Sequence, residues 1–92
     1  MTKAEYIQTL HPNAGKTNKR ILLSKYEVIK ENLIVILKDS NLTHTELMEA
    51  LYVRVNEFFE GGDQWYGETV KLDLEARGII NRIKGKPEKY SL

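Results

Sequence analysis

The sequence contains no cysteine, which excludes disulfides, thiolate nucleophiles and cysteine-ligated zinc. It also has almost no net charge, with 14 Lys and Arg against 13 Asp and Glu, so no overall field draws nucleic acid or a membrane surface to it. No apolar run approaches the roughly 18 residues that span a bilayer, and the N-terminal residues lack the apolar centre of a signal peptide. We therefore expect a cytoplasmic protein of a microbial cell that has no membrane partner.

Recognisable catalytic and metal-binding patterns are equally scarce. His11 and His44 are the only histidines, and neither is spaced from Asp or Glu as a metal-ligand set requires. No nucleophile stands on an elbow-type turn. Residues 15–17, Gly-Lys-Thr, match the end of a phosphate-binding loop, but the position five residues earlier, where the motif needs glycine, is Leu10. The sequence thus predicts a protein that is not an enzyme and has no catalytic residue, metal site or cofactor.

The 92 residues are enough for a single domain, and a composition of 41% apolar and 29% charged residues is ordinary for a globular protein. We divide this domain, residues 1–92, into a short helix with a basic loop (1–23), a helical core (24–78) and a C-terminal β-hairpin (79–92). Lys and Arg outnumber Asp and Glu in the first and last of these parts. Basic side chains are therefore expected at both ends of the chain.

Three segments have the capping-box pattern of a helix N-terminus, in which a hydroxyl accepts from the N3 amide and a glutamate reaches back to the N-cap amide. They are Thr2–Glu5, Ser24–Glu27 and Thr43–Glu46. Asp63 offers a further cap after a helix-breaking pair of glycines. We expect four helices, at about residues 3–9, 25–38, 44–59 and 64–77.

Apolar residues repeat at helical spacing in the last three of these segments and predict the core. The segment between the first two helices, 12–20, is polar and rich in turn formers, so it is expected to be a loop. The inward-facing residues are Tyr26, Ile29, Leu33, Ile36 and Leu37 in the second helix, Leu47, Leu51, Val55 and Phe58 in the third, and Tyr66, Val70 and Leu74 in the fourth.

The C-terminal segment has the pattern of a helix stop followed by a hairpin. Gly78 suits the left-handed position that ends a helix. Residues 79–84 and 89–92 are expected to be strands around a short turn, and a third strand near Ile21 or Leu42 would extend their sheet. This order of elements predicts the α+β class and, within it, a mostly helical winged helix-turn-helix with a two-stranded wing.

In a winged helix the last helix lies in the major groove of DNA and the wing contacts phosphates. Carboxylates repel phosphate, and on the outward face of this helix Lys71 and Gln64 are the only obvious base readers. The helix face is therefore poorly suited to DNA. Its outward residues are expected to be Glu68, Leu72 and Glu75, with Thr69 and Asp73 beside them.

The wing suits nucleic acid better, because Arg82 and Lys84 alternate around Ile83 and so point to the same side of a strand. Lysines along a sheet edge also serve simply to keep that edge solvated, and this second interpretation stays open. The candidate contacts with double-stranded DNA are Arg82, Lys84, Lys86, Lys89, Lys71, Lys16, Lys19 and Arg20.

The alternative function is a surface for a protein partner or for a second copy of the chain. Trp65 follows the glycine break, and exposed aromatic side chains are common in interfaces. The same residue also suits the role of a core anchor at the start of a helix. Nucleic-acid binding and protein binding are therefore competing hypotheses. The candidate residues for the protein surface are Trp65, Glu68, Leu72 and Glu75.

Five segments are informative when taken together. They are His11-Pro12, Gly15-Lys16, Lys25-Tyr26, Trp65-Tyr66 and, most specific, Val-Lys-Leu-Asp-Leu-Glu-Ala-Arg-Gly at 70–78. Because of these segments the chain, from His11 to Leu92, resembles a family of small bacterial proteins of unknown function that is described as winged-helix-like. The resemblance implies that fold and a bacterial origin, and it brings no activity, substrate or site residue to this chain.

Overall fold

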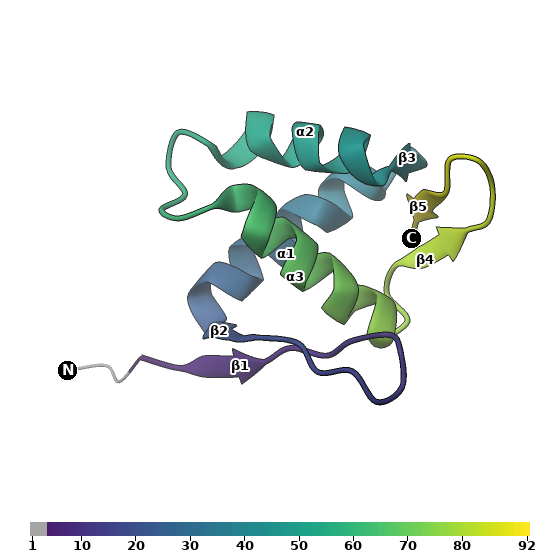
Figure 1. Ribbon diagram of the computed structural model, residues 1–92. Helices are drawn as coiled ribbons and strands as arrows, with labels where there is room; N and C mark the ends of the chain where they lie inside the picture. Colours follow the sequence, from purple (N-terminus) through teal and green to yellow (C-terminus); the bar gives the residue numbers. More distant parts are fainter. Residues whose placement is uncertain (1–3) are drawn as a thin grey trace.

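The computed structural model describes residues 4–92 as an α+β fold of three helices and two small antiparallel sheets (Figure 1). The α+β class expected from the sequence is therefore confirmed. The helices are α1 (Leu23–Leu37), α2 (His44–Val55) and α3 (Asp63–Ala76). The strands are β1 (Tyr6–Gln8), β2 (Arg20–Leu22), β3 (Leu42–Thr43), β4 (Asn81–Ile83) and β5 (Lys89–Ser91).

Each of the three helices packs against the other two (Figure 1). Their apolar stripes meet at the centre, and burying one Leu or Ile side chain there contributes roughly 1.5–3 kcal/mol. The helical periodicity therefore identified most of the core correctly. The inward positions that are confirmed as buried are Tyr26, Ile29, Leu33, Leu37, Leu47, Leu51, Val55, Val70 and Leu74.

The end of α3 has the left-handed glycine that the sequence predicts. Gly78 has φ +76°, and the amides of Ile79 and Ile80 both donate to the carbonyl of Leu74, at 2.9 and 3.2 Å. Because these two amides close the helix, they are not used for strand pairing, and β4 begins only at Asn81. The first strand of the hairpin is thus shorter than expected.

The C-terminal hairpin is part of a three-stranded antiparallel sheet of order β3-β5-β4. On the central strand, Tyr90 lies opposite Arg82 of β4 and opposite Leu42 of β3. The third strand expected near Ile21 or Leu42 is therefore the one at Leu42. Tyr90 is 5% exposed, so its ring anchors the sheet to the core.

The first predicted helix, at 3–9, is wrong for the residues that the structure describes. Residues 6–8 form β1, which pairs with β2 so that Ile7 lies opposite Ile21. A helix this short is unstable alone, whereas the pairing with β2 satisfies the backbone groups of both segments. The capping box expected at Thr2–Glu5 begins outside the described residues.

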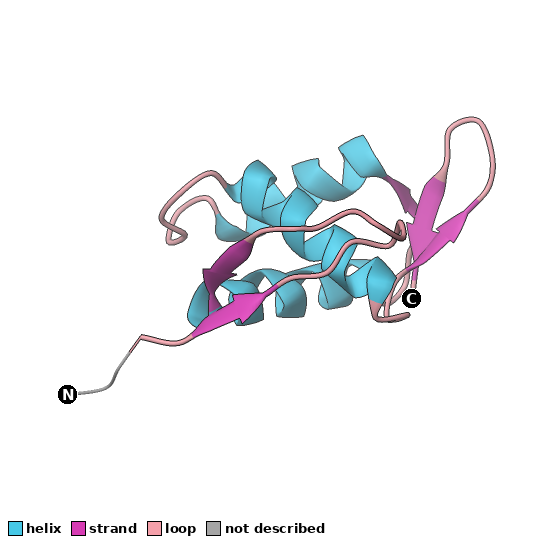
Figure 2. Cartoon of the chain, turned by 60° about the horizontal axis from the view of Figure 1, so that its bottom comes forward, coloured by secondary structure: helices cyan, strands magenta, loops and turns pink. Residues whose placement is uncertain are grey.

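β1, β2 and the loop that connects them form a strap, residues 6–22, that crosses α3 (Figure 2). The Thr9 amide donates to the Lys19 carbonyl at 3.1 Å, which holds the two sides of the strap together beyond the strands. The strap is therefore a third neighbour of α3, besides α1 and α2, and lies on the side of α3 away from α2 (Figure 1).

The caps of the other helices differ from the expectation in two of three cases. The box at α2 is confirmed: Thr43 Oγ1 accepts from the Glu46 amide at 3.2 Å, and the Glu46 carboxylate accepts from the Thr43 amide at 2.9 Å. The cap at Ser24 is wrong, because α1 begins at Leu23, directly after β2. The cap at Asp63 is wrong as well, because this residue lies inside the first turn of α3.

The predicted third helix, α2, is also shorter than expected. It ends at Val55, and Phe58, which the sequence places in the core, is 61% exposed. Phe59 packs against the core instead, and its ring meets the Tyr66 ring edge-on with 5.2 Å between centroids. After Val55 the backbone makes one further turn, in which the amides of Phe58 and Phe59 both donate to the Val55 carbonyl, at 3.2 and 2.9 Å. The contact between Phe59 and Tyr66 joins this turn to α3.

Candidate functional site

The residues expected to bind a protein lie along one side of α3, at positions i, i+3, i+7 and i+10. We call this side, formed by Trp65, Glu68, Leu72 and Glu75, the outer face. Trp65 is 45% exposed and Glu68 is exposed, whereas Leu72 and Glu75 are half-buried. Tyr66, rather than Trp65, packs against the core at the start of the helix. Trp65 is therefore accessible to a partner.

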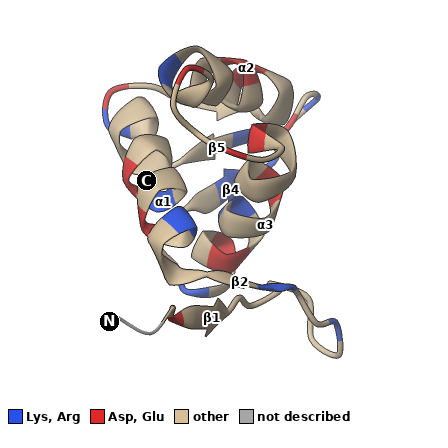
Figure 3. Cartoon of the chain, turned by 90° about the vertical axis from the view of Figure 1, so that its left-hand side faces the viewer, with Lys and Arg blue, Asp and Glu red and all other residues tan. Residues whose placement is uncertain are grey.

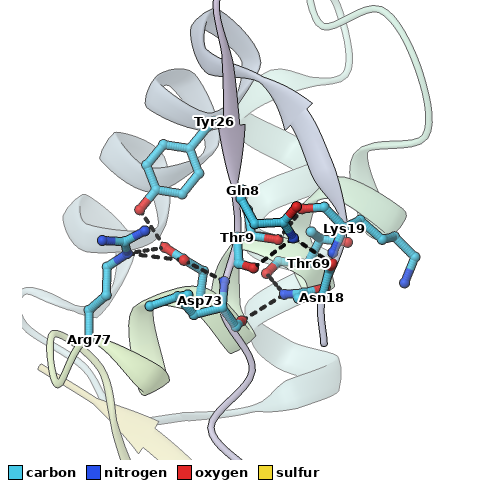
Figure 4. A network of polar contacts seen from close by, with 9 residues as sticks. Gln8, Thr9, Asn18, Lys19, Tyr26, Thr69, Asp73 and Arg77 are labelled. Atoms are coloured by element: carbon cyan, nitrogen blue, oxygen red, sulfur yellow. Dashed lines mark hydrogen bonds and ion pairs between the residues drawn. The ribbon is translucent and has the colours of Figure 1, made fainter. Parts of the chain in front are cut away.

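Thr69 and Asp73, expected beside this face, are corrected by the structure to 3% and 0% exposed. The strap covers them: the Asn18 side chain donates to the Thr69 carbonyl at 3.0 Å, and the Leu10 amide donates to Asp73 Oδ1 at 2.8 Å (Figure 4). Helical periodicity gives the angular position of a residue, but it does not reveal which side a distant segment covers.

Asp73 is the centre of the polar network beneath the strap. Its carboxylate accepts from the Tyr26 hydroxyl and, at 2.9 and 3.0 Å, from Nε of Arg77 (Figure 4). Burial and the hydrogen bond to Asp73 raise the pKa of Tyr26, and the same carboxylate raises the pKa of Arg77. Because its oxygens are occupied and its charge is compensated, Asp73 joins the strap, α1 and α3 and is not open to a ligand.

Lys71 was expected to contact nucleic acid, and the structure corrects this expectation. Its exposure is 4%, and its Nζ lies 3.9 Å from the centroid of the Tyr90 ring on β5. The face of an aromatic ring attracts a cation, more strongly when both are desolvated. Lys71 therefore joins α3 to the three-stranded sheet, and a nucleic acid would not reach it.

The wing, residues 81–91, contains one arginine that is engaged with two carboxylates. Arg82 Nε lies 3.0 Å from Glu75 Oε1, and Arg82 Nη1 lies 3.7 Å from Glu88 Oε1. The hydrogen bond to Glu75 raises the pKa of Arg82. The exposed lysines of the wing, by contrast, form no ion pair with any residue in the described range 4–92: they are Lys84, Lys86 and Lys89.

The basic residues expected on the strap are Lys16, Lys19 and Arg20, and all three are exposed. In Figure 3 the basic residues at β2 are separated from the basic residues on β4. The guanidinium of Arg20 lies 5.2 Å from the Tyr6 ring centroid, and Lys19 Nζ lies 5.5 Å from the Trp65 ring centroid. Lys19 therefore brings positive charge from the strap to the edge of the outer face.

A pocket of about 430 Å³ lies between the start of α2 and the first half of α3. These helices approach each other closely at Gly67, where an added Cβ would lie 2.7 Å from Leu51 Cδ2 and 2.9 Å from Met48 Sδ. Sequence periodicity alone gave no sign of this pocket. We call it the Trp65 pocket, and its walls are His44, Thr45, Met48, Glu49, Gln64, Trp65 and Glu68.

His44 is half-buried in the structure. Its Nδ1 is buried and has no hydrogen-bond partner among the described residues. Burial and the neighbouring charges of Lys71 and Arg82 lower the pKa of the imidazole, although Glu68 and Glu75 oppose them, so the ring is neutral at pH 7. A buried nitrogen without a partner is uncommon in a folded protein, and it leaves one acceptor unused in the pocket wall.

Within residues 4–92, no three His, Asp or Glu side chains are grouped closely enough to hold a metal ion. None of the helices in this range combines the length and apolar character needed to cross a bilayer. The fold and its surface thus define a small α+β protein with three exposed features: a basic wing, an outer face on α3 and a pocket beside it.

The chain belongs to a family of unknown function, DUF6958, whose model matches residues 6–90. This match agrees with the resemblance to an uncharacterised family that was inferred from the sequence. No curated protein and no solved structure matches the chain.

Proposed function

We propose that the chain is a winged-helix module of the bacterial cytoplasm that binds nucleic acid through the phosphate backbone. The order of the elements supports the fold assignment, because α2 and α3 follow one another as a helix pair and β4 and β5 follow them as a hairpin. β3, which lies between α1 and α2, pairs with β5. In winged helices with this arrangement the hairpin extends beyond the last helix and contacts the backbone of a duplex.

The observation that carries the proposal is the uncompensated charge of the wing. Arg82 pairs with the two carboxylates nearest to it, so they are not available to offset the lysines. Lys84, Lys86 and Lys89 are exposed on one short hairpin. Each such lysine can neutralise a phosphate and release its counterions, which is the main source of sequence-independent binding.

We do not assign base reading to α3. Glu68 is exposed on its outer face and would repel phosphate, while Lys71 is buried against Tyr90. Gln64 is exposed, but one side chain does not make a recognition helix. The proposed binding is therefore led by the wing and is largely independent of sequence, with Lys16, Lys19 and Arg20 of the strap as secondary contacts.

Replacing Lys84 and Lys86 together by alanine is expected to weaken binding to a random-sequence DNA duplex. Each lost phosphate contact should reduce the slope of log affinity against log salt by about 0.9. Fluorescence anisotropy of a labelled duplex, titrated at low and at near-physiological salt, measures both quantities. The control is Lys30→Ala with Lys38→Ala, which removes the same charge from α1 and its C-cap.

Two results would overturn this proposal. One is the absence of any binding by the unaltered protein at low salt. The other is an equal loss of affinity in the wing variant and in the α1 variant, because net charge rather than the wing would then account for binding.

A second candidate function is self-association through the outer face. The specific observation in its favour is the 45% exposure of Trp65 beside the half-buried Leu72, since large aromatic residues near an apolar neighbour are typical of interface centres. Like-charged carboxylates on this face, with Glu68 exposed, limit the affinity that two identical faces can reach.

Sedimentation velocity over a wide range of protein concentration tests the second candidate. The unaltered chain should grow in apparent size with concentration, and Trp65→Ala should abolish that growth. Val53→Ala is the matched control, because Val53 is a 74% exposed apolar residue on α2. A monomer at every concentration excludes self-association.

A further inference from the structure

We infer that the Trp65 pocket binds a cationic side chain, arginine or lysine, presented by a peptide segment of a protein partner. Its walls come from two helices, with Glu49 of α2 and Glu68 of α3 both lining it. The volume of about 430 Å³ lies within the range of roughly 300–1,000 Å³ usual for ligand pockets, so it admits one long side chain.

The charge of the pocket walls selects the sign of the ligand. Glu49 and Glu68 are exposed carboxylates, and neither forms an ion pair with a residue in the range 4–92. No Lys or Arg belongs to the pocket walls. A cation that enters would therefore meet two unpaired carboxylates from opposite helices without displacing an existing partner.

Trp65 supplies a flat surface of the kind that a cation prefers. Its ring packs edge-on against the Tyr66 ring, with 4.8 Å between centroids and an interplanar angle of 78°, so a neighbour with a fixed position orients it. Lys19, which is not part of the pocket walls, already lies 5.5 Å from the ring centroid. The ring thus attracts a cation from outside the pocket, and the same quadrupole acts on a cation inside it.

His44 also belongs to the pocket walls, but its Nδ1 atom is not on the surface that a ligand would contact. The atom is buried and has no partner among the described residues. A guanidinium offers several N–H donors in one plane, pairs with carboxylates and stacks on aromatic rings. Arginine therefore suits the two carboxylates and the aromatic ring together, which makes it the preferred of the two side chains.

The inference does not depend on nucleic-acid binding or on self-association. The wing lysines are not part of the pocket, and a small probe tests the pocket without any contact between two copies of the chain. If the pocket does not bind a cationic peptide, the results expected from the duplex titration and from sedimentation velocity stay the same.

Trp65 is the only tryptophan, so intrinsic fluorescence reports directly on this site. The probes are three-residue peptides, Gly-Arg-Gly and Gly-Lys-Gly with blocked ends, and the same peptide with citrulline as an uncharged isostere of arginine. We expect a saturable change with arginine, a weaker one with lysine and none with citrulline. Glu49→Gln with Glu68→Gln should lower the affinity for the arginine peptide by about two- to thirtyfold.

The matched control is Glu31→Gln with Glu57→Gln, which makes the same charge change at exposed residues outside the pocket. Backbone amide NMR shifts give a second readout, and the expected shifts centre on the start of α2 and the first half of α3. The inference is overturned if citrulline binds as well as arginine, if the pocket variant binds like the control variant, or if the shifts map to another surface. Circular dichroism confirms that each variant is folded.

Discussion

Replacing Asp73 by alanine is expected to lower the free energy of unfolding by about 3–5 kcal/mol, because it removes one partner from a buried, charged network. The Tyr26 hydroxyl, the Leu10 amide and Arg77 would all lose their shared acceptor. Asp73 is 0% exposed, so water does not readily replace the lost carboxylate. A protein of this size has on the order of 5–15 kcal/mol of stability, so the loss is a large part of the total.

Urea and thermal unfolding, followed by circular dichroism, measure the effect. A loss of 3 kcal/mol should lower Tm by roughly 12 °C or more in a domain of this length. Glu68→Ala is the control, since it removes an exposed carboxylate from the same helix. Tyr26→Phe removes a single donor to the carboxylate and should cost about 1.5–3 kcal/mol. Equal stabilities of the Asp73 and Glu68 variants would show that the network does not hold the strap to the helices.

Replacing Gly67 by leucine is expected to cost about 2–3 kcal/mol, because an added side chain would overlap Leu51 and Met48 of α2. The nearest atoms, Leu51 Cδ2 and Met48 Sδ, lie 2.7 and 2.9 Å from the position of a Cβ. Leucine is a much better helix former than glycine, by about 0.8–1 kcal/mol, so helix propensity alone predicts a gain. The sign of the measured change therefore distinguishes packing from propensity.

Unfolding in urea gives this sign, with Glu68→Leu as the control at the next, exposed position of α3. Gly67→Ala should fall between the leucine variant and the unaltered protein, since only the flexible ends of two side chains need to move. Met48 also lines the Trp65 pocket, so a change at Gly67 should alter the fluorescence of Trp65. A stabilised leucine variant would contradict the close approach of α2 and α3.

The parts of the fold that the sequence predicted are those encoded by neighbouring residues. The stripes of the three helices, the capping box at Thr43 and the helix stop at Gly78 each depend on a few consecutive positions. β1 could not be predicted in the same way. Its conformation depends on a partner strand near Ile21, and a short segment with a helix-like start gives no sign of that pairing.

In the candidate site, too, the features encoded by neighbouring residues were predictable and those that depend on distant segments were not. The period of α3 placed Glu68 on the outward side, and the structure has it exposed, whereas the sequence left the position of Trp65 open. The pocket between α2 and α3 was not predictable, because it also requires His44 and Glu49 and thus the relative position of two helices. The burial of Lys71 was missed for a similar reason, since it depends on Tyr90 in a strand that pairs only after the chain has turned back.

The strap has a consequence for the order in which the chain folds. Leu10 and its acceptor Asp73 are 63 residues apart in the sequence, and Asn18 and Thr69 are 51 apart. During synthesis, at roughly 5–20 residues per second, the strap leaves the ribosome several seconds before its binding positions on α3 exist. Contacts of such high sequence separation form late because a long loop must close first. The strap is therefore made before the helix that it crosses and reaches its place after that helix.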